Sequence, residues 1–435
     1  MDFNSFGLSS RILDAVTAAG YTTPTPIQAA AIPAVMAGED VMGCAQTGTG
    51  KTAAFVLPML ERLHQTHSAD KRRKVRALII GPTRELAVQI EESIKMFVRF
   101  TKLKSIAVYG GVGIEPQIRG IRNGIDIVIA TPGRLLDLLD RRAINLEDVE
   151  ILVLDEADRM FDMGFINDIR KIVSLTPKTR QTLLFSATMS GPIRSLAEGI
   201  QRKPKMIEVG ERRNPVASVE QHIYPIDQEK KMELLLHIFE NEEMESVIIF
   251  SRTKHGADRI AMRLERNGIQ AVALHSDRTQ SQRLRALDGF KRGRFKVMVA
   301  TDIAARGLDV EGISHVINFD TPTSAEDYIH RIGRTGRAES TGDAFTFVAR
   351  SEEQHLRKME QHIGRRFQRK IYPGFSYKRD DSGERQYRDE NAPRRFSSPV
   401  TNEARDPRFE RDSRGSFGRS RSNTSPAPRN RRHTS

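Results

Sequence analysis

The chain has 435 residues, of which 38% are hydrophobic and 29% charged, and it contains one cysteine, Cys44. This length favours two domains and an extension, since single domains usually hold about 100–200 residues, and the hydrophobic content excludes a wholly disordered chain. Lys and Arg outnumber Asp and Glu by 69 to 56, which indicates a polyanionic partner: nucleic acid or, as the alternative, an acidic membrane surface.

The chain start, MDFNSFGLSS, lacks the basic residues and apolar run of a secretory signal. No stretch approaches the roughly 18 consecutive apolar residues of a membrane helix. One cysteine excludes an intrachain disulfide and a cysteine-rich metal site. We therefore expect a cytoplasmic protein that is not embedded in a membrane.

Short apolar runs alternate with helix-like stretches along the chain, in two series. Runs of roughly four to six apolar residues, separated by helical patterns of about 10–15 residues, are typical of buried parallel strands in βαβ units. The pattern therefore predicts two α/β domains with parallel sheets. The first series is 77–80, 125–130, 151–154 and 182–185, and the second is 247–250, 271–274, 297–300, 316–319 and 344–348.

A change of composition marks each expected boundary. Residues 209–219 (VGERRNPVASV) lack periodicity and suit a linker, which places the domains at 1–208 and 220–375. Residues 376–435 are rich in Arg, Ser, Gly, Asn and Pro, so we expect a disordered basic tail. Its arginines and aromatic residues suit RNA, and a solvated tail is the alternative.

A glycine-rich loop follows the strand-like segment 40–44 and precedes a helix-like run. Such a turn directs backbone N–H groups at a phosphate. Lys51 would neutralise the β and γ phosphates and the Thr52 hydroxyl would bind Mg²⁺, so the loop predicts ATP and Mg²⁺ as ligands. The loop consists of Ala45, Gln46, Thr47, Gly48, Thr49, Gly50, Lys51 and Thr52.

Acidic residues follow the apolar run 151–154, where ligands bind in open α/β sheets. Asp155 would hold Mg²⁺ as a Walker-B acid, and Glu156 would orient and deprotonate the water that attacks the γ-phosphate. The alternative is that these side chains only cap a helix. The phosphate loop upstream favours catalysis.

The second series has no GK[ST] loop, but it contains HRIGRTGR over residues 330–337. Arg334 and Arg337 could reach phosphate across a cleft as arginine fingers, worth about 10³–10⁵ in rate. A solvated basic turn is the alternative. One ATP between the two domains is the simplest arrangement.

Taken in order, these motifs resemble those of DEAD-box ATP-dependent RNA helicases over residues 1–375, most of all the bacterial RhlE-type branch. The segment DEAD is 155–158, and GYTTPTPIQ (20–28) resembles the family's Q motif. The resemblance implies two tandem RecA-like domains that close on ATP and single-stranded RNA, opening short duplexes locally and remodelling RNA or RNA–protein complexes. It assigns Gln28 to the adenine edge, Phe3 and Tyr21 to the adenine pocket, and Asp309 to the ribose.

The same resemblance assigns RNA contacts and a coupling element. SAT, with Ser186 and Thr188, couples hydrolysis to strand separation, and IIFSRTK (248–254) and the pair Gln280 and Arg283 face RNA. The RNA-binding residues it implies are Pro82, Arg84, Gly111, Thr131, Arg134, Arg283 and Thr301.

The implied partners are structured and single-stranded RNA, with a ribosomal precursor or an RNA-degradation complex as the setting, and we expect a monomer. A non-unwinding RNA clamp and a DNA translocase are the rival functions. We interpret Cys44 as a small core residue, and Met160, Phe161 and Met163 as packing residues. His64, His67 and His222 lack a ligand partner at metal spacing, which makes them surface or structural residues.

Overall fold

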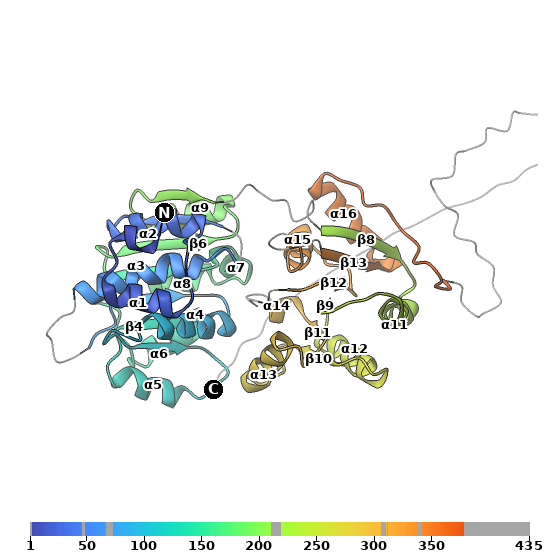
Figure 1. Ribbon diagram of the computed structural model, residues 1–435, viewed down its shortest axis with the longest axis horizontal. Coiled ribbons are helices and arrows are strands. Elements are labelled where there is room, and N and C mark those ends of the chain that lie inside the picture. Colours follow the sequence, from blue (N-terminus) through green and yellow to red (C-terminus); the bar gives the residue numbers. More distant parts are fainter. Residues whose placement is uncertain are drawn as a thin grey trace, which may run out of the picture. The chain divides into compact units, whose positions relative to one another are not determined.

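The first domain is built on a parallel sheet with the strand order β3-β4-β2-β5-β6-β1-β7. Helices lie around this sheet (Figure 1). The computed structural model describes residues 2–45, 48–66, 73–209, 219–305, 310, 312–336 and 342–377. The strands are β1 (Val41–Cys44), β2 (Ala77–Ile80), β3 (Ser105–Val108), β4 (Ile127–Ala130), β5 (Ile151–Leu154), β6 (Gln181–Ser186) and β7 (Lys205–Glu208).

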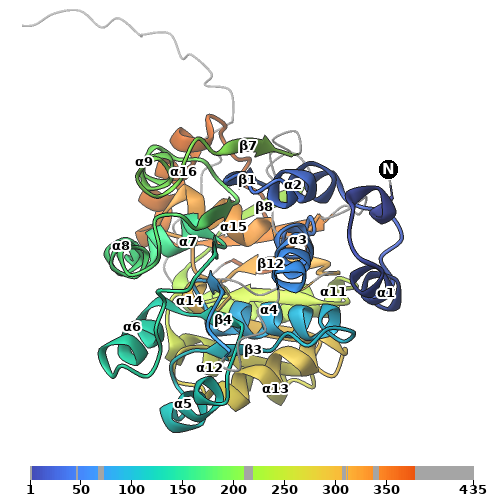
Figure 2. The same cartoon turned by 90° about the vertical axis from the view of Figure 1, so that its left-hand side faces the viewer.

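Helices cover both faces of this sheet. In β5, Ile151 and Val153 belong to the core beneath α2 and α3, whereas Leu152 and Leu154 belong to the core beneath α6 and α8 (Figure 2). Burial on both faces explains why the strand is a continuous apolar run. The helices are η1 (Phe3–Phe6), α1 (Ser10–Ala18), α2 (Pro26–Met36), α3 (Lys51–Gln65), α4 (Arg84–Phe97), α5 (Ile114–Arg122), α6 (Pro132–Asp140), α7 (Ala157–Asp162), α8 (Ile166–Ser174) and α9 (Gly191–Ile200).

The second domain repeats this architecture with the strand order β10-β11-β9-β12-β13-β8, again all parallel. Its strands are β8 (Val219–Pro225), β9 (Val247–Phe250), β10 (Ala271–Leu274), β11 (Val297–Ala300), β12 (His315–Asn318) and β13 (Gly342–Val348). Its helices are η2 (Gln228–Lys230), α11 (Lys231–Asn241), α12 (Lys254–Arg266), α13 (Gln280–Lys291), α14 (Asp302–Ala305), α15 (Ala325–Ile332), η3 (Arg350–Glu352) and α16 (Glu353–Ile363).

Two α/β domains with parallel sheets are thus confirmed. The strands that sequence patterning missed, β3, β7 and β8, all lie at sheet edges. An edge strand leaves side chains exposed, as at Lys205 and Glu208 in β7, so the apolar run that marks a buried strand is absent. Among the described helices, none combines the length and hydropathy that crossing a bilayer requires.

The predicted domain limits stay predictions. Val209 is the last described residue before β8, which begins at Val219, the final residue of the predicted linker. Residues 210–218 and the tail from 378 onward lie outside the described residues.

Of the residues interpreted as core or packing groups, only Phe161 is exposed. Met160 is fully buried, but Phe161, the next residue of α7, is exposed because it lies on the outer side of this short helix. Cys44 is half-buried, and its thiol donates to the carbonyl of Ala187 at 3.6 Å. Met163 and His64 are partly buried, and His67 lies outside the described residues.

Candidate nucleotide and RNA site

The phosphate loop connects β1 to α3, which begins at Lys51. Gly48 and Gly50 have φ values of 84° and 89°, a left-handed conformation that glycine adopts without steric cost. The ammonium group of Lys51 is largely buried and donates to the carbonyl of Ala45 at 2.7 Å. The lysine therefore folds back over the loop, as a phosphate ligand would require; Gln46 and Thr47 lie outside the described residues.

Gln28 joins the predicted adenine pocket to this loop. Its Nε2 donates to the carbonyl of Gly50 at 3.1 Å, and its Oε1 accepts from the backbone N–H of Thr25 at 3.0 Å. A Cβ atom on Gly50 would lie 2.5 Å from Gln28 Nε2, so this close approach requires glycine. The aromatic rings of Phe3 and Tyr21, which were also assigned to this pocket, pack edge to face with their centroids 6.2 Å apart.

Three buried carboxylates follow β5 directly: Asp155, Glu156 and Asp158. Burial, together with the nearby carboxylates of Glu156 and Asp158, raises the pKa of Asp155 to about 7, although the charge of Lys51 acts in the opposite direction. A divalent cation would remove this electrostatic cost, and carboxylate and hydroxyl oxygens are the ligands that Mg²⁺ prefers. Asp155 and the Thr52 hydroxyl therefore fit the ion that the loop implies.

Glu156 adopts a left-handed backbone conformation with φ 54°, which is strained for a non-glycine residue. It occupies the N-cap position of α7, yet its side chain makes no capping hydrogen bond. Its carboxylate instead accepts from Arg159 Nη1 at 2.7 Å, and both side chains are buried. Sequence reasoning missed Arg159, although its spacing of three residues on a helix could have indicated the pair.

Asp158 ties β5 to the segment after β6. One of its carboxylate oxygens accepts from the backbone N–H groups of Ala187 and Thr188, each at 3.2 Å, and from the Thr188 hydroxyl at 3.4 Å. Ser186 donates to the carbonyl of Thr188 at 2.8 Å. The predicted coupling residues and the acidic segment thus form one hydrogen-bonded unit.

The predicted RNA contacts of the first domain lie after the carboxyl ends of three neighbouring strands. Pro82 and Arg84 follow β2, Gly111 follows β3, and Thr131 follows β4. Gly111 has φ 81°, and a Cβ atom there would lie 1.9 Å from Arg84 Nη1. Only glycine permits this contact between two predicted RNA ligands.

Arg134, the remaining predicted contact of this domain, lies in the first turn of α6. Its Nη2 donates to the carbonyl of Val112 at 3.0 Å. Its Nη1 is buried without a hydrogen-bond partner in the described part of the chain. Such a donor suits an external acceptor, as a phosphate would be.

In the second domain, Thr301 follows β11 and Arg334 is buried in the turn after α15. Met1–Lys378 forms one compact unit. Within it, Arg283 Nε forms an ion pair with Glu85 Oε1 at 2.7 Å, and the side-chain amide of Gln280 donates to the same oxygen at 3.1 Å. Glu85 is a partner that the sequence did not indicate. Asp309 and Arg337 lie outside the described residues.

His222 is predicted to lack a ligand partner at metal spacing, but the structure places two carboxylates beside it. Its Nε2 lies 3.1 Å from Asp343 and 3.5 Å from Glu220, because β13 pairs with β8 in this register. The ammonium of Lys370 already lies 3.2 Å from His222 Nδ1 and 3.6 Å from Glu220. The Lys370 ammonium therefore pairs with one of the two carboxylates, that of Glu220.

Two family profiles match the chain: "DEAD/DEAH box helicase" over residues 25–196 and "Helicase conserved C-terminal domain" over residues 230–339. The chain is 43% identical over 371 residues to the DEAD-box ATP-dependent RNA helicase CshA of Bacillus subtilis (strain 168), covering 85% of this chain and 74% of that protein. It belongs to the DEAD-box family. This DEAD-box protein is also 44% identical over 366 residues to the ATP-dependent RNA helicase CshA of Listeria monocytogenes, covering 84% and 69% of the two chains.

A solved structure gives the same result for the fold. Saccharomyces cerevisiae Dbp5 bound to RNA and ADP BeF3 superposes with a TM-score of 0.73 at 30% identity, covering 85% of this chain and 95% of that one. The DEAD-box protein therefore has two RecA-like domains, binds ATP and RNA, and is an ATP-dependent RNA helicase. Both curated relatives above bear the name CshA, so the prediction is confirmed for the family and not for the RhlE-type branch.

Proposed function

We propose that this DEAD-box protein opens short RNA duplexes locally, using ATP hydrolysis at the phosphate loop and the DEAD segment. The observation that carries this proposal is the group of buried carboxylates after β5, joined through Asp158 to Thr188. Acidic groups that serve only as surface caps would be exposed. Buried carboxylates beside a phosphate loop suit catalysis on a nucleoside triphosphate.

The chemistry divides among residues of the first domain. Lys51 would exchange its bond to Ala45 for the β and γ phosphates, and Thr52 and Asp155 would hold Mg²⁺. When bound, this ion neutralises phosphate charge. Glu156 would orient the attacking water and accept its proton, while Arg159 fixes the direction of the Glu156 carboxylate through their bond of 2.7 Å.

Further residues complete the proposed nucleotide site. Gln28 would read the adenine edge with Phe3 and Tyr21 beside the base, Asp309 would bind the ribose, and Arg334 and Arg337 would stabilise charge on the phosphate that is transferred. The remaining loop residues, Ala45, Gln46, Thr47, Gly48, Thr49 and Gly50, would surround the phosphates. The bond between Gln28 and Gly50 supports a link between base recognition and loop conformation.

The proposed RNA path uses backbone contacts. The placement of Arg84, Gly111 and Thr131 after neighbouring strands supports it. The Nη1 of Arg134, which has no hydrogen-bond partner among the described residues, supports it as well. Pro82, Arg283 and Thr301 would add further contacts, and contacts to 2′-hydroxyl groups would explain a preference for RNA. Ser186 and Thr188 would transmit the state of the nucleotide to this path.

Opening a duplex requires only local melting in this proposal. Each base-pair step costs on the order of 1–2 kcal/mol, so one cycle of ATP binding can disrupt a short helix without processive movement. We also propose that the protein is a cytoplasmic monomer of the RhlE-type branch and acts on a ribosomal precursor or within an RNA-degradation complex.

Comparing RNA and DNA as stimulators of ATP turnover, together with unwinding of a short RNA duplex, tests the proposal. We expect RNA to stimulate turnover far more than DNA, and unwinding to require ATP. Equal stimulation by DNA would favour a DNA translocase. Stimulation by RNA without unwinding would favour a non-unwinding RNA clamp.

A further inference from the structure

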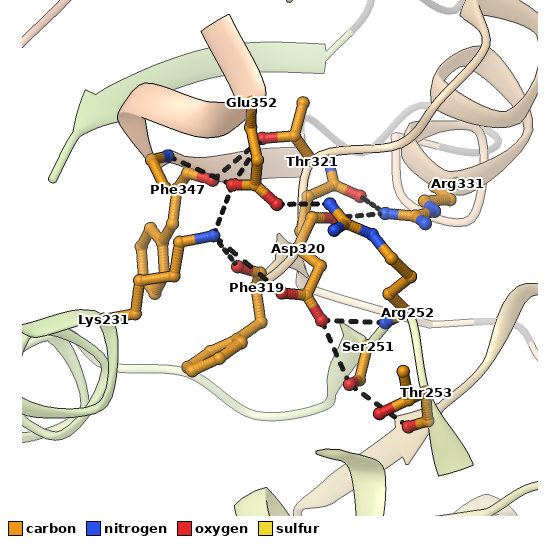
Figure 3. A network of polar contacts seen from close by, with 12 residues as sticks. Lys231, Ser251, Arg252, Thr253, Phe319, Asp320, Thr321, Arg331, Phe347 and Glu352 are labelled. Atoms are coloured by element: carbon orange, nitrogen blue, oxygen red, sulfur yellow. Dashed lines mark hydrogen bonds and ion pairs between the residues drawn. The ribbon is translucent and has the colours of Figure 1, made fainter. Parts of the chain in front are cut away.

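A buried network of charges surrounds the start of α11 in the second domain (Figure 3). Lys231 is fully buried, and its Nζ lies 2.6 Å from Glu352 Oε2, 2.8 Å from the carbonyl oxygen of Phe319 and 3.9 Å from Asp320 Oδ1. Burial lowers the pKa of Lys231, while Glu352 and Asp320 oppose that shift. The ammonium therefore lies between two carboxylates.

Both carboxylates also bind the loop Ser251–Thr253, which follows β9. Asp320 Oδ2 accepts from the backbone N–H of Arg252 at 2.8 Å and from the Ser251 hydroxyl at 3.2 Å. Glu352 Oε1 accepts from Arg252 Nη2. Arg252 is thus held through its backbone by Asp320 and through its guanidinium by Glu352, as Figure 3 shows.

The network is balanced only when Arg252 is counted. Lys231 and Arg252 supply two positive charges, and Asp320 and Glu352 supply two negative charges. Glu352 is 2% exposed, and a charge in such a place must be paired and hydrogen-bonded. The Arg252 side chain is 47% exposed, so one side of the network reaches solvent at this residue.

We propose that Lys231 and Glu352 are positioning residues that hold Arg252 and its loop in the conformation that binds an RNA phosphate. This inference rests on the proposed function and on the RNA-facing role that the family resemblance implies for the segment 248–254. A guanidinium fixed through one nitrogen has lost its rotamer entropy before the ligand arrives. Its remaining donors match the planar geometry of phosphate oxygens.

Glu352→Gln tests this directly in the full chain, because it preserves the size of the side chain and removes its charge. The RNA concentration for half-maximal stimulation of ATP turnover should rise about three- to tenfold, the effect of weakening one charge-assisted contact. Turnover at saturating RNA and the KM for ATP at saturating RNA should change less than about twofold.

The double-mutant cycle with Arg252→Ala separates positioning from general loss of structure. The RNA requirement is the RNA concentration that gives half-maximal stimulation of ATP turnover. If Glu352 acts through Arg252, Glu352→Gln should raise this concentration little further once Arg252 is truncated. Glu360→Gln is the matched control, since Glu360 is another buried glutamate of the second domain, bound to Arg369 at 2.6 Å and to the N–H of Phe367 at 2.7 Å. It should leave the RNA requirement unchanged.

An unchanged RNA requirement in Glu352→Gln would overturn the positioning role, and so would additive effects in the cycle or an equal rise in Glu360→Gln. If Glu352→Gln lowers the melting temperature too far, Lys231→Met combined with Glu352→Gln removes both buried charges together, and its RNA requirement should still rise. A wild-type protein that RNA does not stimulate would contradict the proposed function itself, which is a separate outcome.

Discussion

Glu156 combines two features at the residue scale that an acidic surface residue would not have: a left-handed backbone and a buried ion pair with Arg159. Strained conformations persist where the surrounding structure holds them, and they gather at functional sites. Although Glu156 is the N-cap residue of α7, its carboxylate makes no capping hydrogen bond and accepts from Arg159 instead. This geometry favours the catalytic interpretation over the capping alternative.

Replacing Glu156 with Gln should therefore remove the carboxylate that accepts the proton, while the size of the side chain and the shape of the site are preserved. ATP hydrolysis in the presence of RNA should fall by about 10²–10⁴-fold, while binding of ATP and RNA is retained and the protein accumulates on RNA. Single-turnover hydrolysis and RNA binding measured on the same preparation check this. Turnover close to wild type would remove Glu156 from the role.

Gln28→Ala should weaken ATP binding more than GTP binding, because the amide that would read the adenine edge is lost. The loop should also loosen, since the bond to the carbonyl of Gly50 disappears. Nucleotide titrations measure both effects, with Gln117→Ala as a control: Gln117 is likewise buried but donates to the carbonyl of Tyr109 at 3.1 Å, away from the loop. Equal turnover of ATP and GTP by the intact protein would contradict the assignment.

At the scale of elements, parallel strands bring dispersed motifs to one edge of each sheet. Arg84 begins the helix after β2 and Gly111 belongs to the loop after β3, yet they touch, because β4 pairs with both strands. The carboxyl ends of the strands lie together, so residues far apart in sequence can contact the same backbone of a ligand.

Gly111→Ala should displace Arg84, since the new methyl group would overlap its guanidinium. We expect the RNA concentration for half-maximal stimulation to rise about tenfold, as removal of one phosphate contact predicts, with ATP binding unchanged. Gly164→Ala is the matched control: its φ of 79° imposes similar backbone strain, but nothing lies within 4 Å of the new methyl group. Equal effects of the two substitutions would show that strain alone, not Arg84, is responsible.

At the scale of the whole molecule, the positive charge of the C-terminal tail should affect affinity for RNA and not the rate of ATP hydrolysis. Residues 378–435 carry 15 Lys and Arg against 9 Asp and Glu, whereas the proposed catalytic residues precede them in the chain. Deleting this tail should leave turnover at saturating RNA nearly unchanged. The RNA requirement should rise at low salt, and the difference should shrink as salt increases.

The salt dependence of RNA affinity measures how many phosphates the tail neutralises. For a single strand, every phosphate that the protein no longer neutralises lowers the slope of log K against log salt by roughly 0.7. Half-maximal RNA concentrations measured at several salt concentrations for the full and truncated chains provide the test. Equal values at low salt would leave the tail as a solvated segment.

The central strands and the site motifs could be predicted from sequence because their signals are local. The run Ile151–Leu154 is apolar since both faces of β5 are buried. Asp155 follows β5 directly, and Lys51 follows β1 after one short loop. The edge strands β3, β7 and β8 were missed, and β7 shows why with its exposed Lys205 and Glu208.

The partners of these residues depend on strand pairing and helix placement, which no local pattern encodes. His222 meets Asp343 across β8 and β13, Asp158 meets Thr188 across β5 and β6, and Lys231 meets Glu352 over a separation of 121 residues. The sequence by itself determined which groups we propose as phosphate ligands, since that chemistry lies in contiguous motifs. Only the tertiary structure decided how those groups are held, because a buried charge must find its counter-charge wherever the packed strands and helices bring one.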